Sequence, residues 1–371
     1  DIKRIADTVT QRVSLPKFSK VVSREEIRNN EYNLNIPRYV DSSESAESWD
    51  IYASMFGGIP KSEIDELSAI WEAFPGLKEK LFTDDGSPYV QISVADVKKA
   101  IQESSDVIAF ESAYNNAFAD FSEYLYHSLI DEVTTVEINK EEAVVSENIF
   151  ARMRSIPLID RYEAYQILDD GWAKIAIDLE VIQTEGFDAT KKVDPNLVIK
   201  KKDGKDQEVQ EGWVGHIVPF ELVQSTLLSG DFEALKAKQS RLAEIPAGYE
   251  EIIDSMTEDE KGTEVLNDAN DAFVPKEVTK KLKELRQDEK TEDNLSFIAK
   301  LEQVEALIKD EKDLKAQIKK DDAALQAKTK ETIEALTHEQ ARNLLSEKWI
   351  SPIVTTLQGL PESIVDALVG K

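Results

Sequence analysis

The stretch LSFIAKLEQVEALIKDEKDLKAQIKKDDAALQAKTKETIEAL, residues 295–336, contains neither Gly nor Pro. Its apolar residues recur at steps of mostly three, four or seven positions, and Lys and Glu fill the gaps. Because a helix has 3.6 residues per turn, this spacing predicts one long helix with a narrow apolar stripe. Such a stripe requires a partner helix, either within the chain or from another subunit. Residues 275–290 are the partner that we expect within the chain.

Helical spacing also occurs on the amino-terminal side. Residues 1–12, 59–74 and 94–129 each carry apolar side chains at helical steps, with Pro60 placed in a first helical turn. Ser23-Arg24-Glu25-Glu26 has the pattern of a capping box, which predicts a short helix to about Asn30. Residues 94–129 are rich in aromatics, and we interpret this stripe as a packed helix face, with a base-stacking surface as the alternative.

One region in the middle of the chain favours strands. Residues 173–182, AKIAIDLEVI, alternate as a strand does, and residues 197–202 and 208–217 flank Asp203-Gly204, a strong hairpin signal. After Pro219 the chain is helical almost to its end, apart from an acidic loop over 254–271. The sequence therefore predicts a mainly α fold with a small β-sheet (α+β), and a helical carboxy-terminal region with a long coiled-coil-like helix.

Composition limits the class of protein. The 371 residues include 73 acidic and 45 basic side chains, for a formal net charge of -28, and this field repels phosphate. Any nucleic-acid contact must then be local, or come from a missing domain or partner. The absence of Cys excludes disulfides and thiolate metal sites and is typical of a cytoplasmic protein. No stretch approaches the roughly 20 apolar residues of a membrane span.

No motif for catalysis or cofactor binding is present. The chain has no Gly-x-Gly, no phosphate loop and no Gly-x-Ser-x-Gly elbow. His127, His216 and His338 lie far apart, without a carboxylate at metal-ligand spacing. Asp194-Pro195-Asn196 lacks the second proline and the aromatic of an amino-methyltransferase motif, so we interpret it as a loop. We predict no catalytic, cofactor-binding or metal-binding residue in this chain.

Residues 18–41 read FSKVVSREEIRNNEYNLNIPRYVD. This segment resembles the one that follows the catalytic domain in type I restriction-modification DNA-methyltransferase (modification) subunits, where Asn-Asp-Tyr-Asn-Leu-Asn-Ile leads into Arg-Tyr-Val. Glu31 replaces the usual Asp. Weaker resemblance to the long-tailed branch of that family extends over residues 57–82, 156–172, 211–224 and 344–357. The missing initiator Met further suggests that the chain begins inside a longer protein.

The resemblance implies transfer of a methyl group from S-adenosylmethionine to adenine N6 by the parent protein. It implies a specificity subunit and a motor-nuclease subunit as partners, and DNA bound through the complex. The catalytic and cofactor motifs of the family lie upstream of Asp1. On this reading residues 1–45 are the end of the methyltransferase domain and a linker. Residues 46–160 are a helical domain, 161–225 a small β-containing subdomain and 226–371 a helical region.

Two groups of residues are candidates for DNA contact. In the first, Arg38, with Asn33 or Asn35, touches a phosphate or shapes the target-base pocket. The other interpretation of this segment is an extended strand on the catalytic domain, with the two Asn fixing local turns. The second group is the basic cluster on the predicted hairpin, which is either a phosphate contact or a strand edge protected by charge: Lys200, Lys201, Lys202 and Lys205.

Two further hypotheses remain open. In the first, the chain is an acidic coiled-coil scaffold whose long helix pairs with a partner subunit. In the second, the chain is a DNA mimic whose surface carboxylates take the place of phosphates. Interleaving of Lys with the acidic residues along the helices argues against the mimic, because that pattern is typical of a solvated face.

Overall fold

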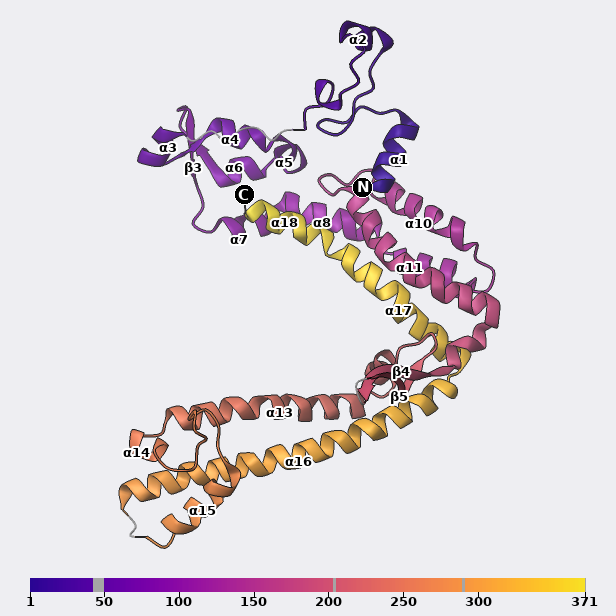
Figure 1. The fold of residues 1–371 in the computed structure, drawn as a ribbon. Coiled ribbons are helices and arrows are strands. Elements are labelled where there is room, and N and C mark those ends of the chain that lie inside the picture. The colour runs from indigo at the N-terminus through magenta and orange to yellow at the C-terminus, as the bar shows by residue number, and fades with distance from the viewer. Residues whose placement is uncertain (43–49, 203–204, 289–290, 371) are drawn as a thin grey trace. The chain divides into compact units, whose positions relative to one another are not determined.

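The computed structural model describes residues 1–42, 50–202, 205–288 and 291–370. The chain divides into two compact units. Unit 1 consists of Asp1–Thr184 and Trp349–Lys371, and unit 2 consists of Glu185–Lys348. The expected class is confirmed, since both units are mainly helical and the sheets are small and antiparallel (Figure 1). None of the described helices is both long enough and apolar enough to cross a bilayer.

Unit 1 is a body of helices with one small sheet. Its elements in chain order are α1 (Ile2–Gln11), α2 (Arg24–Asn29), η1 (Ile36–Arg38), α3 (Ile51–Phe56), β1 (Ile59–Pro60), α4 (Lys61–Glu66), α5 (Ser68–Ala73), α6 (Leu77–Leu81), β2 (Phe82–Asp84), β3 (Tyr89–Ile92), α7 (Val97–Gln102), α8 (Ser105–Ala117), α9 (Phe121–Tyr126), the π-helical η2 (His127–Asp131), α10 (Ile138–Arg152), α11 (Arg161–Glu185), the last part of α17 (His338–Gln358) and α18 (Leu360–Val369).

The aromatic stripe of residues 94–129 lies in the core of unit 1. Phe110, Tyr114, Phe118 and Phe121 are all buried, and the hydroxyl of Tyr114 donates a 2.9 Å hydrogen bond to the carbonyl oxygen of Leu357. A buried aromatic ring stabilises by area removed from water, and the bonded hydroxyl avoids a desolvation penalty. The interpretation of the stripe as a packed helix face is confirmed.

The expected continuous helix over residues 59–74 is wrong. Ile59 and Pro60 instead form the short strand β1, which pairs antiparallel with β3, and the helix begins only at Lys61. The strand order is β1-β3-β2, so β1 lies at an edge. An edge strand accommodates Pro60 because the missing N–H is not needed for pairing there.

The expected strand over residues 173–182 is also wrong, because these residues lie within α11. The buried side chains of α11 recur at helical steps along one face: Ala164, Leu168, Trp172, Ile175, Leu179 and Ile182. Residues 173–182 fit both the two-residue period of a strand and the 3.6-residue period of a helix. The longer apolar face of the 25-residue helix selects the helix.

Unit 2 consists of a hairpin and long helices. Its elements are η3 (Phe187–Lys191), β4 (Val193–Lys202), β5 (Lys205–Gly215), α12 (Phe220–Leu227), α13 (Ser229–Asp254), α14 (Glu258–Lys261), α15 (Pro275–Leu285), α16 (Glu292–Glu334) and the first part of α17. The predicted hairpin is confirmed by the pairing of β4 with β5, from Val193 opposite Gly215 to Lys202 opposite Lys205. Asp203 and Gly204, the expected turn, lie outside the described residues.

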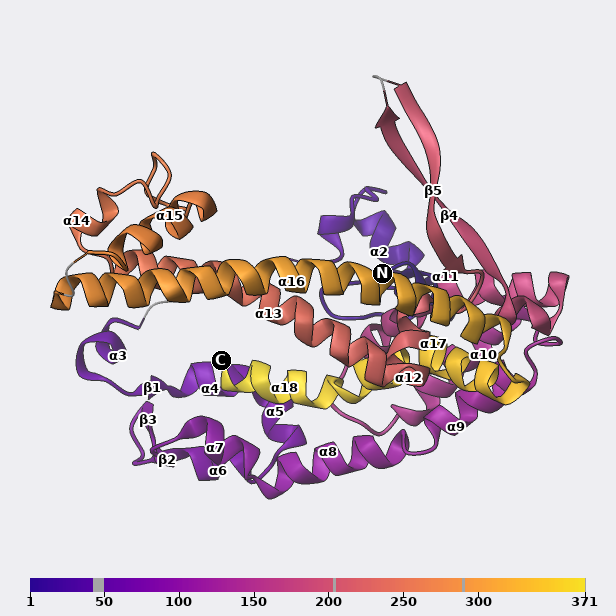
Figure 2. The same cartoon turned by 90° about the horizontal axis from the view of Figure 1, so that it is seen from below.

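The predicted long helix is confirmed as α16, with 43 residues. It runs beside α13 in both views of the fold, and α15 packs against it as well (Figures 1 and 2). Phe297, Leu301 and Val304 of α16 are buried in one cluster with Val278 and Leu282 of α15, to which Ile252 and Ile253 of α13 also belong. The apolar stripe of α16 is therefore covered from within unit 2, by α15, which lies in the expected partner segment 275–290, and also by α13.

Candidate functional site

The polar side of α1 faces the body of unit 1. Nη1 of Arg4 donates a 3.2 Å hydrogen bond to Oδ2 of Asp160, which directly precedes α11. The hydroxyl of Tyr162 donates to Oδ2 of Asp7 at 3.3 Å, and Thr8 is buried. Contacts between α1 and the helical body are therefore made by ionised and hydrogen-bonding groups.

Aromatic rings complete this contact. Nζ of Lys3 lies 5.7 Å from the ring centroid of Phe150 in α10 and 5.9 Å from that of Tyr165 in α11. The guanidinium of Arg4 lies 5.7 Å from the centroid of Tyr162. Cations at these distances from a ring face are attracted by its quadrupole, by about 0.5–1 kcal/mol at exposed sites.

The apolar side of α1 faces outward. The side chains of Ile2, Ile5 and Val9 share one helix face, and they are 86%, 52% and 70% exposed. A surface helix ordinarily turns its apolar face to the core and its charged face to water. In α1 this arrangement is inverted, because the charged face is the one in contact with the body of unit 1.

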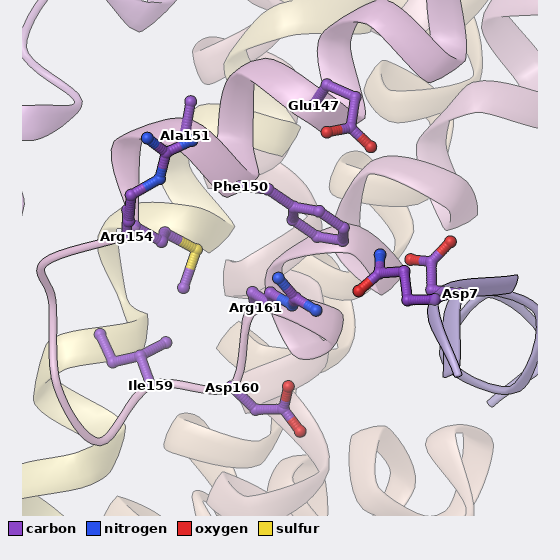
Figure 3. Close-up of a pocket in the computed structure, with 10 residues that line it drawn as sticks. Asp7, Glu147, Phe150, Ala151, Arg154, Ile159, Asp160 and Arg161 are labelled. Carbon is purple, nitrogen blue, oxygen red and sulfur yellow. The ribbon is translucent and has the colours of Figure 1, made fainter. Parts of the chain in front are cut away.

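A cavity of about 450 Å³ lies between the carboxy-terminal half of α1, α10 and the loop before α11 (Figure 3). Asp7 reaches into it from α1, and the side chain of Arg161 lies between Phe150 and Asp160. Its lining consists of Asp7, Gln11, Glu147, Phe150, Ala151, Met153, Arg154, Ile159, Asp160 and Arg161.

One charged group of this cavity binds α1 to the body, since Asp160 pairs with Arg4 at 3.2 Å. Asp7 pairs with Lys3 within α1, also at 3.2 Å. The guanidinium of Arg161 stacks 5.0 Å from the ring centroid of Phe150. Among the residues that the structure describes, no group of three or more His, Asp and Glu could hold a metal ion.

Residues Arg24–Asn29 form α2 as the sequence predicts, with Ser23 as its N-cap. The hydroxyl oxygen of Ser23 accepts a 3.1 Å hydrogen bond from the backbone N–H of Glu26, which is one half of the expected capping box. The carboxylate of Glu26 instead receives Nζ of Lys20 at 2.6 Å. The side chains of Arg24 and Arg28, one helical turn apart, are exposed.

The segment that follows α2 begins with a strained turn. Glu31 and Tyr32 have φ angles of 56° and 57°, and the N–H of Asn33 donates to the carbonyl oxygen of Asn30 at 3.0 Å. Two central residues at positive φ with this hydrogen bond make a type I′ turn, for which Gly and Asn are preferred. Glu and Tyr at these positions cost roughly 1 kcal/mol each in backbone strain.

The interpretation of the segment around Asn33, Asn35 and Arg38 as an extended strand is wrong, because Ile36–Arg38 form the 3-10 helix η1. Asn33 does fix a local turn, since its Oδ1 accepts a 2.9 Å hydrogen bond from the N–H of Asn35. The hydroxyl of Tyr39 donates to the carbonyl oxygen of Asn33 at 2.6 Å, and Arg38 is exposed. The structure thus brings Asn33, Asn35 and Arg38 into one compact loop.

This loop also exposes apolar side chains. Tyr32, Leu34 and Ile36 are 68%, 71% and 71% exposed. Residues 1–42 thus expose two groups of apolar side chains, one on the outer face of α1 and one on this loop, which we name together the amino-terminal apolar surface: Ile2, Ile5, Val9, Tyr32, Leu34 and Ile36. The sequence shows the helical spacing of Ile2, Ile5 and Val9, but it does not show that this face is uncovered.

The lysines of the second candidate group lie in unit 2. Lys200 forms an ion pair with Glu211 across the hairpin, and exposed Lys201 lies opposite Asp206. Figure 2 shows the hairpin as a long twisted ribbon that extends away from α13 and α16. The side chains of Lys202 and Lys205 lie outside the described residues. Acidic neighbours offset the positive charge of the described part of this cluster.

A contact that spacing does not predict lies at the base of the hairpin. Nδ1 of His216 lies 2.6 Å from Oδ2 of Asp194, and Nε2 lies 3.3 Å from Oε1 of Glu185. Hydrogen bonding to Asp194 raises the pKa of His216, with a smaller contribution from Glu185. Lys192 also pairs with Glu185, at 2.6 Å. We interpret this cluster as a polar network that stabilises the base of the hairpin, where Val193 pairs with Gly215.

Comparison with known proteins concerns the same amino-terminal region. Residues 1–48 match the family model described as N-6 DNA Methylase. No curated protein and no solved structure matches the chain significantly. The amino-terminal segment, which carries α1, α2 and η1, is thus similar to N-6 DNA methylases.

Proposed function

We propose that this chain is the carboxy-terminal part of the modification subunit of a type I restriction-modification enzyme, which methylates adenine N6 in DNA with S-adenosylmethionine. In this proposal residues 1–42 complete the methyltransferase domain. The remaining residues serve assembly with the specificity and motor-nuclease subunits and clamping of DNA.

The observation that carries the proposal is the inverted orientation of α1. Its charged face is held by Arg4 and Asp7, whereas Ile2, Ile5 and Val9 are exposed in the segment that matches the methylase family. An exposed apolar patch in a monomer marks an interaction site. A methyltransferase domain packed on the amino-terminal apolar surface would bury it, and would be linked through Lys3 and Arg4 to the helical body.

In this proposal no residue of this chain binds the cofactor. S-adenosylmethionine supplies the methyl group when it is bound by the upstream part of the family's catalytic domain. Our proposal assigns no described residue to holding it, and gives residues 1–42 the task of supporting that domain.

The scaffold hypothesis loses its main support in the structure. It requires the stripe of α16 to be free for a partner, yet Phe297, Leu301 and Val304 are buried against α15 and α13. The DNA-mimic hypothesis requires carboxylates that are free on the surface. Along α16 several are paired instead, such as Asp310 with Arg241 and Asp321 with Lys238.

A methyl-transfer assay tests the proposal in the longer gene product that carries this chain, purified with its specificity subunit. Ile5→Asp combined with Val9→Asp should lower incorporation of methyl groups from S-adenosylmethionine into adenine on the order of 10-fold or more, because it places two charges in a buried interface. The matched control Ile177→Asp combined with Ile108→Asp, which changes two exposed apolar residues of α11 and α8, should leave the rate unchanged.

Equal activity of the apolar-surface variant and the control would refute the placement of the methyltransferase domain. A gene that encodes no methyltransferase domain upstream of these residues would refute the proposal itself. Calorimetry of the 371-residue chain with S-adenosylmethionine adds a third arm, in which we expect no binding heat.

A further inference from the structure

Charge is unevenly distributed along this acidic chain. Residues 12–38 contain six Lys and Arg against three Asp and Glu, whereas the whole chain contains 45 against 73. This 27-residue segment is therefore net positive, within a protein of net charge -28. A local basic region in an acidic protein is the electrostatic signature of a confined anion contact.

Most cations of this segment have no carboxylate partner in the part of the chain that the structure describes. Lys20 is paired with Glu26 at 2.6 Å. The other five form no ion pair with any residue that the structure describes, and all five are exposed: Arg12, Lys17, Arg24, Arg28 and Arg38. They are thus available to an external anion without first breaking an internal contact.

The backbone around these cations is held in place by specific interactions. The strained turn at Glu31 and Tyr32 follows α2, and the bond from Tyr39 to Asn33 closes the loop that contains η1. Of the six non-glycine residues at positive φ that the structure describes, Arg12, Lys17, Glu31 and Tyr32 lie in residues 12–38. Backbone strain of this kind concentrates at functional sites, where the surrounding structure maintains it.

The arginines suit phosphate in particular. A guanidinium presents a rigid fork of N–H donors that binds a phosphate through two parallel hydrogen bonds. Arg24 and Arg28 share one face of α2, because residues four apart are neighbours on a helix surface. Apart from Glu26, which pairs with Lys20, the segment contains two acidic residues, Glu25 and Glu31, which are too few to neutralise the five cations.

We infer that residues 12–38 form a contact for the phosphate backbone of duplex DNA, made by Lys17, Arg24, Arg28 and Arg38. The inference rests on the proposed function for the choice of DNA as the polyanion. It gives residues 1–42 two kinds of contact, in which the exposed apolar side chains pack against protein and the cations of residues 12–38 touch the nucleic acid. The contact is independent of base sequence, because phosphates carry no sequence information.

Binding of labelled duplex DNA by the 371-residue chain tests the inference directly, measured over about 50 to 200 mM salt. The test variant changes Lys17, Arg24, Arg28 and Arg38 to Gln. The matched control replaces four lysines of α16 with Gln. These lysines are exposed and form no ion pair with a described residue: Lys309, Lys312, Lys319 and Lys320. Both variants lose four positive charges, so long-range repulsion of DNA increases equally.

We expect the chain to bind DNA with an affinity that falls as salt rises. Each lost phosphate contact lowers the slope of log affinity against log salt by about 0.9, so the test variant should lose most of the slope and affinity on the order of 10-fold or more. The control should keep the slope. Hydrogen exchange of the amides of residues 24–38 should slow when DNA is added.

Either of two results would overturn the inference: equal slopes for the test and control variants, or no binding of DNA by the unaltered chain at the lowest salt. Binding of an acidic protein partner that is lost in the test variant, with DNA binding unchanged, would assign the surface to that partner instead. These outcomes are separate from the methyl-transfer assay, because none of them depends on the methyltransferase domain.

Discussion

The indole Nε1 of Trp349 donates a 2.8 Å hydrogen bond to Oδ2 of the buried carboxylate of Asp178, 171 positions earlier in the chain. Both residues belong to unit 1, so this bond attaches the carboxy-terminal helices to α11. Ile353 contributes to the same packing, since its side chain lies close to Gly171 of α11. Residues after Trp349 are thereby part of the amino-terminal unit.

Trp349→Phe should lower the free energy of unfolding of unit 1 by about 2–3 kcal/mol, because it removes a hydrogen bond to a charged group and leaves a gap in the core. Chemical denaturation followed by circular dichroism measures this change. Trp213→Phe is the control, since Trp213 is 41% exposed on β5, and it should cost about 0.5 kcal/mol or less. Equal effects of the two variants would contradict the role given to the Trp349 bond.

The inverted orientation of α1 predicts opposite results for its two faces in the isolated chain. Arg4→Met removes the ion pair with Asp160 and the stacking on Tyr162, and should weaken the docking of α1 by about 1 kcal/mol. Ile5→Ser, on the outer face, should leave docking unchanged. Hydrogen exchange of the α1 amides measures both. Faster exchange in Ile5→Ser than in Arg4→Met would show that the apolar face is the docked one.

Relief of the strained turn should stabilise the motif locally. Glu31→Asn places a residue that tolerates left-handed φ at 56°, and should raise the free energy of opening of this turn by about 0.5–1 kcal/mol. Exchange of the Asn33 amide, which donates to Asn30, reports this opening and should slow several-fold. The same change at Glu180, inside α11, should be slightly destabilising instead, because Asn is a poorer helix former than Glu.

The stability of the base of the hairpin, where His216 contacts Asp194 and Glu185, should depend on pH. The pKa of His216 is raised, chiefly by hydrogen bonding to Asp194, so protonated His216 stabilises the folded state. This contribution is fully present below the ordinary pKa of His, near 6.5, and is lost as pH rises through the raised value. Amide exchange in β4 and β5 should therefore be slower, relative to the intrinsic rate, at pH 6 than at pH 8.5.

Asp194→Asn provides the control for this pH dependence. The carboxamide keeps a hydrogen-bonding partner for the ring of His216 but removes the negative charge that raises its pKa. Glu185, which also faces the ring, is shared with Lys192 and should maintain only a small effect. An unchanged pH profile in Asp194→Asn would assign the dependence to another group.

Local patterns were sufficient for several elements. The long run without Gly or Pro over 295–336 predicts α16, and Asp203-Gly204 between apolar runs predicts the pairing of β4 with β5. The hydroxyl of Ser23 caps α2 as its spacing indicates. Each of these features depends on residues close in sequence, where propensity and hydrogen bonding are short-range.

Predictions were wrong where two local patterns competed. Residues 173–182 fit a strand as well as a helix, and the buried face that extends from Leu168 to Ile182 selects the helix. Pro60 suits a first helical turn and an edge strand equally, and pairing with Tyr89 selects the strand. In both cases the deciding contacts come from residues outside the pattern.

The sequence by itself determined that the chain is mainly helical, that α16 is long, that one hairpin interrupts the helices and that residues 18–41 carry a methyltransferase-like motif. Only the tertiary structure decided which face of α1 is covered, which cations after it pair with no carboxylate of the described residues and which helices cover α16. Periodicity identifies the faces of a helix, but burial depends on what packs against each face. The partners of Arg4 and Trp349 lie more than a hundred positions away, and only the folded chain brings them within hydrogen-bonding distance.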